Sequence, residues 1–261
     1  MNTPHVRFGG TSWVVAGNFA ENLKRLSRDV RDMEIVLFEA PGWSNMPMRS
    51  EVLALRELCG ELEMTCTVHF PVDIPCHMER REREKSEDIC LYTTELFEPL
   101  EPFGWVVHLV GRQDDPFPGC DLERWLENAE KSAARIANAL PDKRYLCAET
   151  LGYDFTVAHD LVRRLGVSIC FDAGHVIKLG LPVLEQLRKF APETRIVHLH
   201  GVMPDGTDHA DLSFFDRDCL RALIGILEED KKERVVTIEV FEDDYDRSVE
   251  VLKAVERSWV K

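Results

Sequence analysis

Residues 195–200, RIVHLH, place two histidines, His198 and His200, two positions apart in an apolar run. Such alternation is typical of a β-strand, in which residues i and i+2 point to the same side. A polar, turn-rich stretch follows at 201–213, GVMPDGTDHADLS, and then a segment with apolar residues three or four apart. We therefore expect a strand, a loop and a helix in this order, with the histidines close to the loop.

The same unit recurs along the whole chain. Short β-branched runs that predict strands lie at 6–10, 34–38, 65–70, 105–110, 145–150, 167–171, 195–200 and 235–240. Between them, helical spacing predicts helices near 18–30, 49–62, 79–99, 122–139, 155–165, 179–190, 214–229 and 243–258. Eight strand–helix units in 261 residues predict an α/β fold, a single (β/α)8 TIM barrel that covers residues 1–261 as one domain.

A doubly wound open sheet is the alternative that also alternates strands and helices. Its first strand is often followed by a glycine-rich phosphate loop. Here the first strand leads into GGTSWVVAGN, residues 9–18, whose glycines do not fit GxGxxG, and the chain has no Walker sequence. The barrel is therefore the favoured interpretation.

Composition narrows the class of partner. The net charge of −15 disfavours nucleic acid, because polyanion binding depends on Lys and Arg contacts to phosphates. No apolar run approaches the ~20 residues that a membrane span needs. Eight cysteines lie at positions 59, 66, 76, 90, 120, 147, 170 and 219, and none of them forms a CxxC pair. This spacing favours buried thiols in a reducing cytoplasm. We expect a cytoplasmic protein that acts on a small molecule.

Histidines and acidic residues gather where the predicted strands end. Strands three to eight each carry a potential metal ligand at or after their carboxyl ends, where barrels place their active sites. The candidates on or after the predicted strands are Glu39, His69, His108, Glu149, Asp172, His175, His198, His200, Asp208, His209 and Glu239.

A divalent metal explains this pattern well. An ionisable group near a low-dielectric barrel mouth is costly unless it is paired, and a cation can offset that cost for several groups together. No Lys or Arg lies within the strand ends that hold the proposed ligands, Glu149, Asp172, His198 and Glu239. Taken singly, His108 fits a hydrogen-bonded core imidazole equally well, and Glu39 fits an ion pair with an arginine of the opening helix. His175 and His200 each fit a further ligand or a donor to a ligand.

With these residues in view, the whole chain resembles the xylose isomerase-like barrels, the superfamily that also contains apurinic endonucleases of the endonuclease IV type. The resemblance implies that Glu149, Asp172, His198 and Glu239 bind metal, with Asp172 and His175 forming its DxxH element. The endonuclease-like branch adds metal-binding histidines on strands three and four, which His69 and His108 match. Its DxH element after strand seven is matched only in part, since His209 fits but Thr207 stands in place of the Asp.

The sugar isomerase and epimerase branch shares the four-residue core, but commonly follows its strand-seven His with a Glu and an Arg. Neither occurs in HLHGVMPDG. A narrower resemblance, in LFEAPGWSNMP, TVHFPVD and DGTDHADLS, is to the cobamide-remodelling phosphodiesterases, which cut the nucleotide loop of corrinoids. This resemblance agrees with the acidic charge, because a small corrinoid phosphodiester needs no extended basic face.

The leading hypothesis is a divalent-metal-dependent phosphodiesterase that binds one to three ions. Imidazole and carboxylate ligands suit Zn, Mn, Fe or Co. Glu149 and Glu239 are its expected catalytic residues, and Glu39, His200 and Asp208 its expected substrate contacts. The alternative is a metal-dependent isomerase or epimerase of a sugar or sugar phosphate, in which Glu149 and Glu239 act as acid and base. A third hypothesis is a corrinoid or sugar-phosphate binding protein without turnover.

Overall fold

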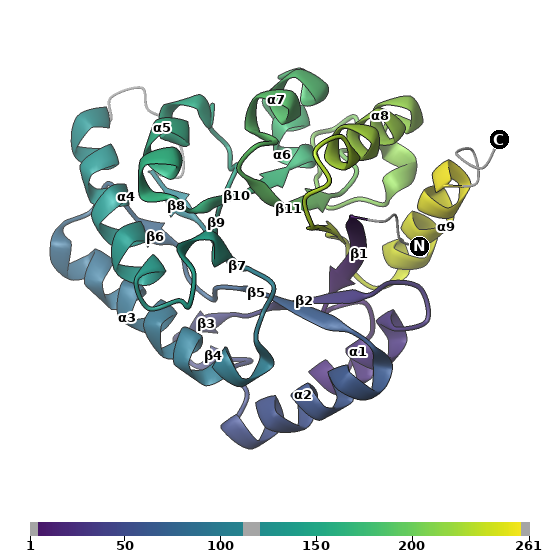
Figure 1. The fold of residues 1–261 in the computed structure, drawn as a ribbon, viewed down its shortest axis with the longest axis horizontal. Coiled ribbons are helices and arrows are strands. Elements are labelled where there is room, and N and C mark those ends of the chain that lie inside the picture. The colour runs from purple at the N-terminus through teal and green to yellow at the C-terminus, as the bar shows by residue number, and fades with distance from the viewer. Residues whose placement is uncertain (1–4, 112–120, 257–261) are drawn as a thin grey trace.

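The computed structural model describes residues 5–111 and 121–256. Eight strands close into a barrel in the order β1-β12-β11-β10-β9-β7-β5-β2, and every neighbouring pair is parallel. Helices surround this barrel (Figure 1). The predicted (β/α)8 architecture is confirmed.

The barrel strands are β1 (Val6–Thr11), β2 (Asp32–Val36), β5 (Thr65–His69), β7 (Trp105–Val107), β9 (Leu146–Glu149), β10 (Ser168–Asp172), β11 (Thr194–Leu199) and β12 (Arg234–Ile238). The described helices are α1 (Phe19–Leu26), α2 (Arg49–Leu62), α3 (Arg80–Phe97), α4 (Leu122–Ala137), α5 (Thr156–Leu165), α6 (Ala173–Lys178), α7 (Val183–Phe190), α8 (Arg217–Glu228) and α9 (Asp243–Glu256). Two small sheets lie outside the barrel: β3 (Glu39–Ala40) with β4 (Trp43–Ser44), and β6 (Ile74–Pro75) with β8 (Leu109–Val110). Positions 257 and 258 of the last predicted helix, and Cys120, lie outside the described residues.

The second barrel strand lies two residues earlier than the predicted 34–38. Beyond Val36 the side chain of Asn45 takes over the backbone groups: its Oδ1 accepts from the Phe38 N–H at 2.7 Å, and its Nδ2 donates to the Val36 carbonyl at 2.9 Å. The strand ends there because a side-chain amide replaces the next rung of the ladder.

Two other predicted elements have different bounds. The predicted helix 179–190 begins only at Val183, as α7, because Gly180 adopts a left-handed φ of +68° and Pro182 is the N-cap; the short helix α6 before it was not predicted. The predicted strand 105–110 ends as β7 at Val107, and Leu109–Val110 pair instead with β6. His108 lies between the two pairings.

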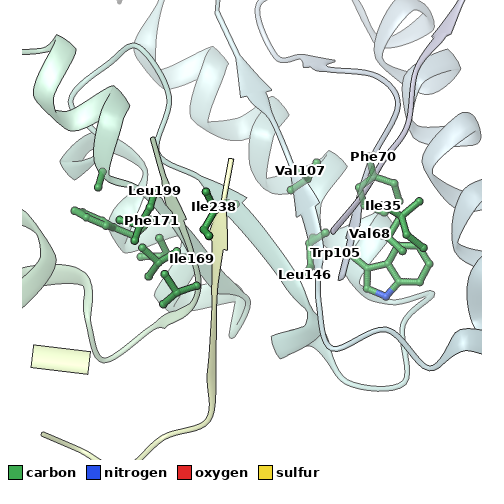
Figure 2. Close-up of a cluster of buried hydrophobic side chains, with 14 of the residues drawn as sticks. Ile35, Val68, Phe70, Trp105, Val107, Leu146, Ile169, Phe171, Leu199 and Ile238 are labelled. Carbon is green, nitrogen blue, oxygen red and sulfur yellow. The ribbon is translucent and has the colours of Figure 1, made fainter. Parts of the chain in front are cut away.

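Side chains alternate along the barrel strands between two cores. Val106, Cys147, Cys170 and Ile196 from four adjacent strands pack together inside the barrel. The intervening residues point outward and form the larger core that the helices cover; Figure 2 shows ten of them labelled, among them Ile169 and Phe171. By this period of two, the inward positions at the carboxyl ends of the strands face one another across the barrel mouth.

No helix within residues 5–111 and 121–256 is long and apolar enough to cross a membrane. The seven described cysteines are free thiols, and all but Cys219 are buried.

Candidate metal centre

The carboxyl-terminal ends of six barrel strands bring ionisable side chains together. Nitrogen and oxygen atoms of these residues form overlapping groups in which all atoms lie within 4.8 Å of one another. The residues are His69 at the end of β5, His108 after β7, Glu149 at the end of β9, Asp172 at the end of β10, His198 in β11 and Glu239 after β12.

The central group is formed by Glu149, Asp172, His198 and Glu239, all of them buried. Nδ1 of His198 lies 3.1 Å from Glu239 Oε2, 3.7 Å from Glu149 Oε1 and 3.8 Å from Asp172 Oδ2. Three carboxylates therefore converge on one imidazole nitrogen, as the sequence predicted from the strand ends.

The donor set fits a divalent cation. His198 Nδ1 and Glu239 Oε2 are buried and have no hydrogen-bond partner among the described residues, although they lie next to each other. Buried polar atoms without partners are rare, because each loses its hydration without compensation. A cation bound between the imidazole and the three carboxylates would satisfy these atoms together.

The other nitrogen of His198 contacts a residue that the sequence analysis did not select. Nε2 lies 2.9 Å from Oε2 of Glu34, on β2, and both side chains are fully buried. One signal was available: Glu34 is a charged residue with apolar neighbours on both sides, in MEIV. Because β2 begins two residues earlier than predicted, Glu34 is not its first residue but lies in its middle, with its side chain inside the barrel.

A second group of ligand atoms adjoins the first. Nε2 of His69 and Nε2 of His108 lie 3.0 Å apart, and Glu149 Oε2 is 2.8 Å from His108 and 3.5 Å from His69. The Nδ1 atoms face acceptors, the Phe70 carbonyl at 3.0 Å and Asp73 Oδ1 at 2.9 Å. Each ring therefore carries a hydrogen on Nδ1, so Nε2 is the nitrogen of each ring that could bind a cation together with Glu149.

His175 lies between the two groups, at the start of α6. Its backbone N–H donates to Asp172 Oδ1 at 2.6 Å, and its Nδ1 lies 3.4 Å from Glu149 Oε1 and 3.5 Å from Asp172 Oδ2. The helix turn that directly follows β10 thus brings both members of the DxxH element to one centre.

His200 lies behind Asp172 and is fully buried. The backbone N–H of His209 donates to His200 Nδ1 at 3.0 Å. Because a backbone N–H can only donate, Nδ1 must be the acceptor, although it also lies 3.2 Å from the Gly201 carbonyl. The ring hydrogen is therefore on Nε2, which lies 3.2 Å from Asp172 Oδ1. In this geometry His200 holds Asp172 in position and has no free lone pair for a metal.

The loop after β11 contributes His209 at the edge of the site. Its Nε2 lies 3.7 Å from Glu239 Oε2, and its ring stacks on that of His200 with centroids 4.3 Å apart. Asp208 accepts a hydrogen bond from Lys178 at 2.5 Å and lies 3.3 Å from His209 Nδ1. Thr207 is exposed, and its backbone N–H is bonded to Asp205.

Glu39 lies apart from these groups. It is exposed on the β3–β4 hairpin, where its Oε2 accepts a hydrogen bond from the Ser44 hydroxyl at 2.5 Å. The sequence placed it directly after the second predicted strand, 34–38, but that strand ends at Val36.

The protonation of the metal-free site follows from this geometry. Burial lowers the pKa of His108, but the Glu149 and Asp73 carboxylates raise it to about 10 overall. Burial likewise lowers the pKa of His175 and His209, while Asp172 beside the first and Glu239 beside the second raise each to about 9. At neutral pH these imidazoles are therefore protonated, and their positive charge offsets the negative charge of the carboxylates in the absence of a metal cation.

Comparison with known proteins agrees with this architecture. A family model described as "Xylose isomerase-like TIM barrel" matches residues 28–255. No curated protein sequence matches the chain.

Solved structures with a similar fold include a D-tagatose 3-epimerase-like protein, 19% identical with a TM-score of 0.75, covering 97% of each chain. A D-psicose 3-epimerase, determined in the presence of D-fructose, is 14% identical with a TM-score of 0.69, covering 94% of this chain and 89% of that one. The IOLI protein with a bound zinc atom is 13% identical with a TM-score of 0.71, covering 97% of each chain. At these identities the similarity shows the fold alone.

Proposed function

The chain belongs to the xylose isomerase-like TIM barrel family, and from this premise we propose that it is a divalent-metal-dependent phosphodiesterase of a small molecule. The proposal depends most on one observation, the pair His69 and His108, whose Nε2 atoms meet Glu149 beside the central group. Glu149 presents Oε2 to this pair and Oε1 to the side of His198. A carboxylate shared in this way suits two neighbouring cations.

The chemistry follows from that pairing. When bound, two divalent cations would stabilise charge on phosphoryl oxygens and acidify a water. Glu149 would hold both positions, His69 and His108 would complete one, and Asp172, His198 and Glu239 the other. Asp73 would keep the hydrogen of His108 on Nδ1, and so keep Nε2 available.

The rim of the site supplies contacts for a phosphoryl group. The side chains of His175 and His209 are 18% and 28% exposed. They are also the residues that would hold a third cation, but Thr207 supplies no carboxylate there. We therefore expect two cations, with these imidazoles donating hydrogen bonds to the substrate anion. Asp208, paired with Lys178 beside His209, lies close enough to orient it.

The substrate class follows from charge. A net charge of −15 is unfavourable for a long polyanion, so the phosphodiester is proposed to belong to a small molecule. The nucleotide loop of a corrinoid is the narrower candidate, because LFEAPGWSNMP and DGTDHADLS resemble the cobamide-remodelling phosphodiesterases.

The second candidate is a sugar epimerase or isomerase. It is supported by the fold shared with the D-tagatose 3-epimerase-like protein and the D-psicose 3-epimerase. In that reaction Glu149 and Glu239 would exchange protons with a keto sugar held at one cation. His69 and His108 would then contact substrate hydroxyls rather than a second ion.

Metal content and turnover distinguish these functions. Freshly purified protein would be analysed for metal by mass spectrometry, then assayed against phosphodiesters, including a corrinoid, and against ketohexoses. We expect about two ions per chain and chelator-sensitive phosphodiester cleavage. One ion with ketose epimerisation would support the second candidate. Less than one ion, with activity untouched by chelator, would contradict both, and binding without turnover would indicate a binding protein.

A further inference from the structure

Glu34 and His198 are 164 positions apart in the sequence, yet their side chains meet inside the barrel. Both are fully buried, and Glu34 Oε2 lies 2.9 Å from His198 Nε2. Glu34 lies on the opposite side of the imidazole from Glu149, Asp172 and Glu239, which face Nδ1. The ring thus separates one carboxylate from three others.

This contact decides where His198 carries its hydrogen. A carboxylate only accepts, so Nε2 must donate to Glu34, and in the neutral ring Nδ1 then has the lone pair. Nδ1 is also the atom that faces the three carboxylates of the central group. The neutral ring is therefore held in the tautomer that a metal ligand requires.

Glu34 has few polar partners besides His198 in the described part of the chain. Its Oε1 has no hydrogen-bond partner in the described part of the chain, and besides His198 its carboxylate has one further hydrogen bond there, from the Thr237 hydroxyl to Oε2 at 3.4 Å. Within residues 5–111 and 121–256, no Lys or Arg nitrogen comes within 4.0 Å of it. A buried carboxylate without a cationic partner is unfavourable. A cation on Nδ1 would polarise the imidazole and strengthen its hydrogen bond to Glu34.

We propose that Glu34 is a positioning residue of the metal centre, which holds the His198 ring in orientation and tautomer through Nε2 and so tightens binding of the cation at Nδ1. This inference rests on the proposed metal-dependent function and adds to it a residue that does not touch the metal. Partners of this kind typically contribute 10- to 100-fold in metal affinity.

The test compares two buried carboxylates of the same strand. Glu34→Gln keeps the size of the side chain and removes its charge. Asp32→Asn is the matched control: Asp32 is also fully buried on β2, two residues away, but its oxygens accept from the hydroxyls of Thr65, at 2.5 Å, and Thr67, at 3.0 Å. Affinity for Zn²⁺ and Co²⁺ would be measured by competition with a chelating dye, and folding by circular dichroism.

We expect Glu34→Gln to bind metal about 10- to 100-fold more weakly than wild type and to change the visible absorption of bound Co²⁺, while Asp32→Asn changes neither. Nitrogen NMR of ¹⁵N-histidine-labelled, Zn²⁺-loaded protein should show the His198 hydrogen on Nε2 in wild type and a changed Nε2 signal in Glu34→Gln. Equal weakening in both variants, or none in Glu34→Gln, would overturn the role of Glu34. Wild type that binds no metal would refute the proposed function itself, a result that is distinct because it appears before any variant is made.

Discussion

Gly174 lies against the imidazole of His200 so closely that a Cβ at position 174 would overlap the ring atoms. The same ring lies 3.2 Å from Asp172 Oδ1 through Nε2. The glycine of FDAGH is therefore required by the space that His200 occupies, and not by the backbone conformation of α6.

Gly174→Ala should weaken metal binding. The added methyl must displace His200, which would free Asp172 to rotate away from the central group. We expect affinity for Zn²⁺ to fall by about 10-fold, measured by chelator competition. Gly60→Ala is the control, because no heavy atom lies within 4 Å of a Cβ at this position in α2. It should leave metal binding unchanged and stabilise the fold by about 0.5–1 kcal/mol; equal metal affinity in the two variants would contradict the role assigned to His200.

His108→Ala should remove one cation and leave the other. The central group keeps its four residues, while the second group loses one of its two imidazoles. Metal analysis should show one ion fewer per chain, and phosphodiester cleavage should fall by at least about 100-fold, since a metal supplies several kcal/mol of transition-state stabilisation. His159→Ala is a suitable control, because His159 lies on α5, where its Nε2 pairs with Glu193 at 3.1 Å. An epimerase would instead keep its metal and change its sugar preference.

Metal binding should release protons. The raised pKa values, about 10 for His108 and about 9 for His175 and His209, mean that these imidazoles are protonated at pH 7 without metal. Metal must displace a proton from His108, so affinity should increase as pH rises towards 9. Calorimetric titration in two buffers of different ionisation enthalpy would count the protons. Binding enthalpy independent of the buffer would contradict the assignment.

The same imidazoles should make the metal-free protein sensitive to alkaline pH. Each has a higher pKa in the folded than in the unfolded chain, so its stabilisation is complete below about pH 6.5. It should be lost as pH rises through about 9 to 10, the folded values of His108, His175 and His209. Thermal melting from pH 6 to 10 should show a falling Tm without metal, and a smaller fall when metal replaces the protons.

Arg234→Lys should destabilise the fold without touching the site. The buried guanidinium of Arg234 binds both oxygens of Asp230, at 2.6 and 2.8 Å, and donates to the carbonyls of Ala191, Thr194 and Leu227. One ammonium group cannot reach all of them. We expect a loss of about 2–4 kcal/mol in the free energy of unfolding, measured by urea titration. The exposed Arg80, paired with Glu84, is the control, and Arg80→Lys should change stability by less than about 0.5 kcal/mol.

Much of the fold was predictable because its signals are local. Period-two runs such as RIVHLH and VVTIEV predict strands wherever they occur, and their carboxyl ends must meet at one mouth in a closed parallel barrel. Elements were misplaced where a side chain or a conformation overrode the pattern. Asn45 ends β2 through its amide, and Gly180 with Pro182 delays the start of the predicted helix 179–190 to Val183.

The sequence by itself determined the barrel and the gathering of Glu149, Asp172, His198 and Glu239, because alternation and chain order set which side chains face the mouth. Only the tertiary structure decided how these residues act, since hydrogen-bond partners come from strands far apart in the chain. Glu34 reaches His198 across 164 residues, Gly174 leaves space for His200, and Glu39 lies outside on a hairpin. Period and burial can be read along one strand, but which nitrogen of an imidazole keeps a free lone pair depends on what packs against its other side.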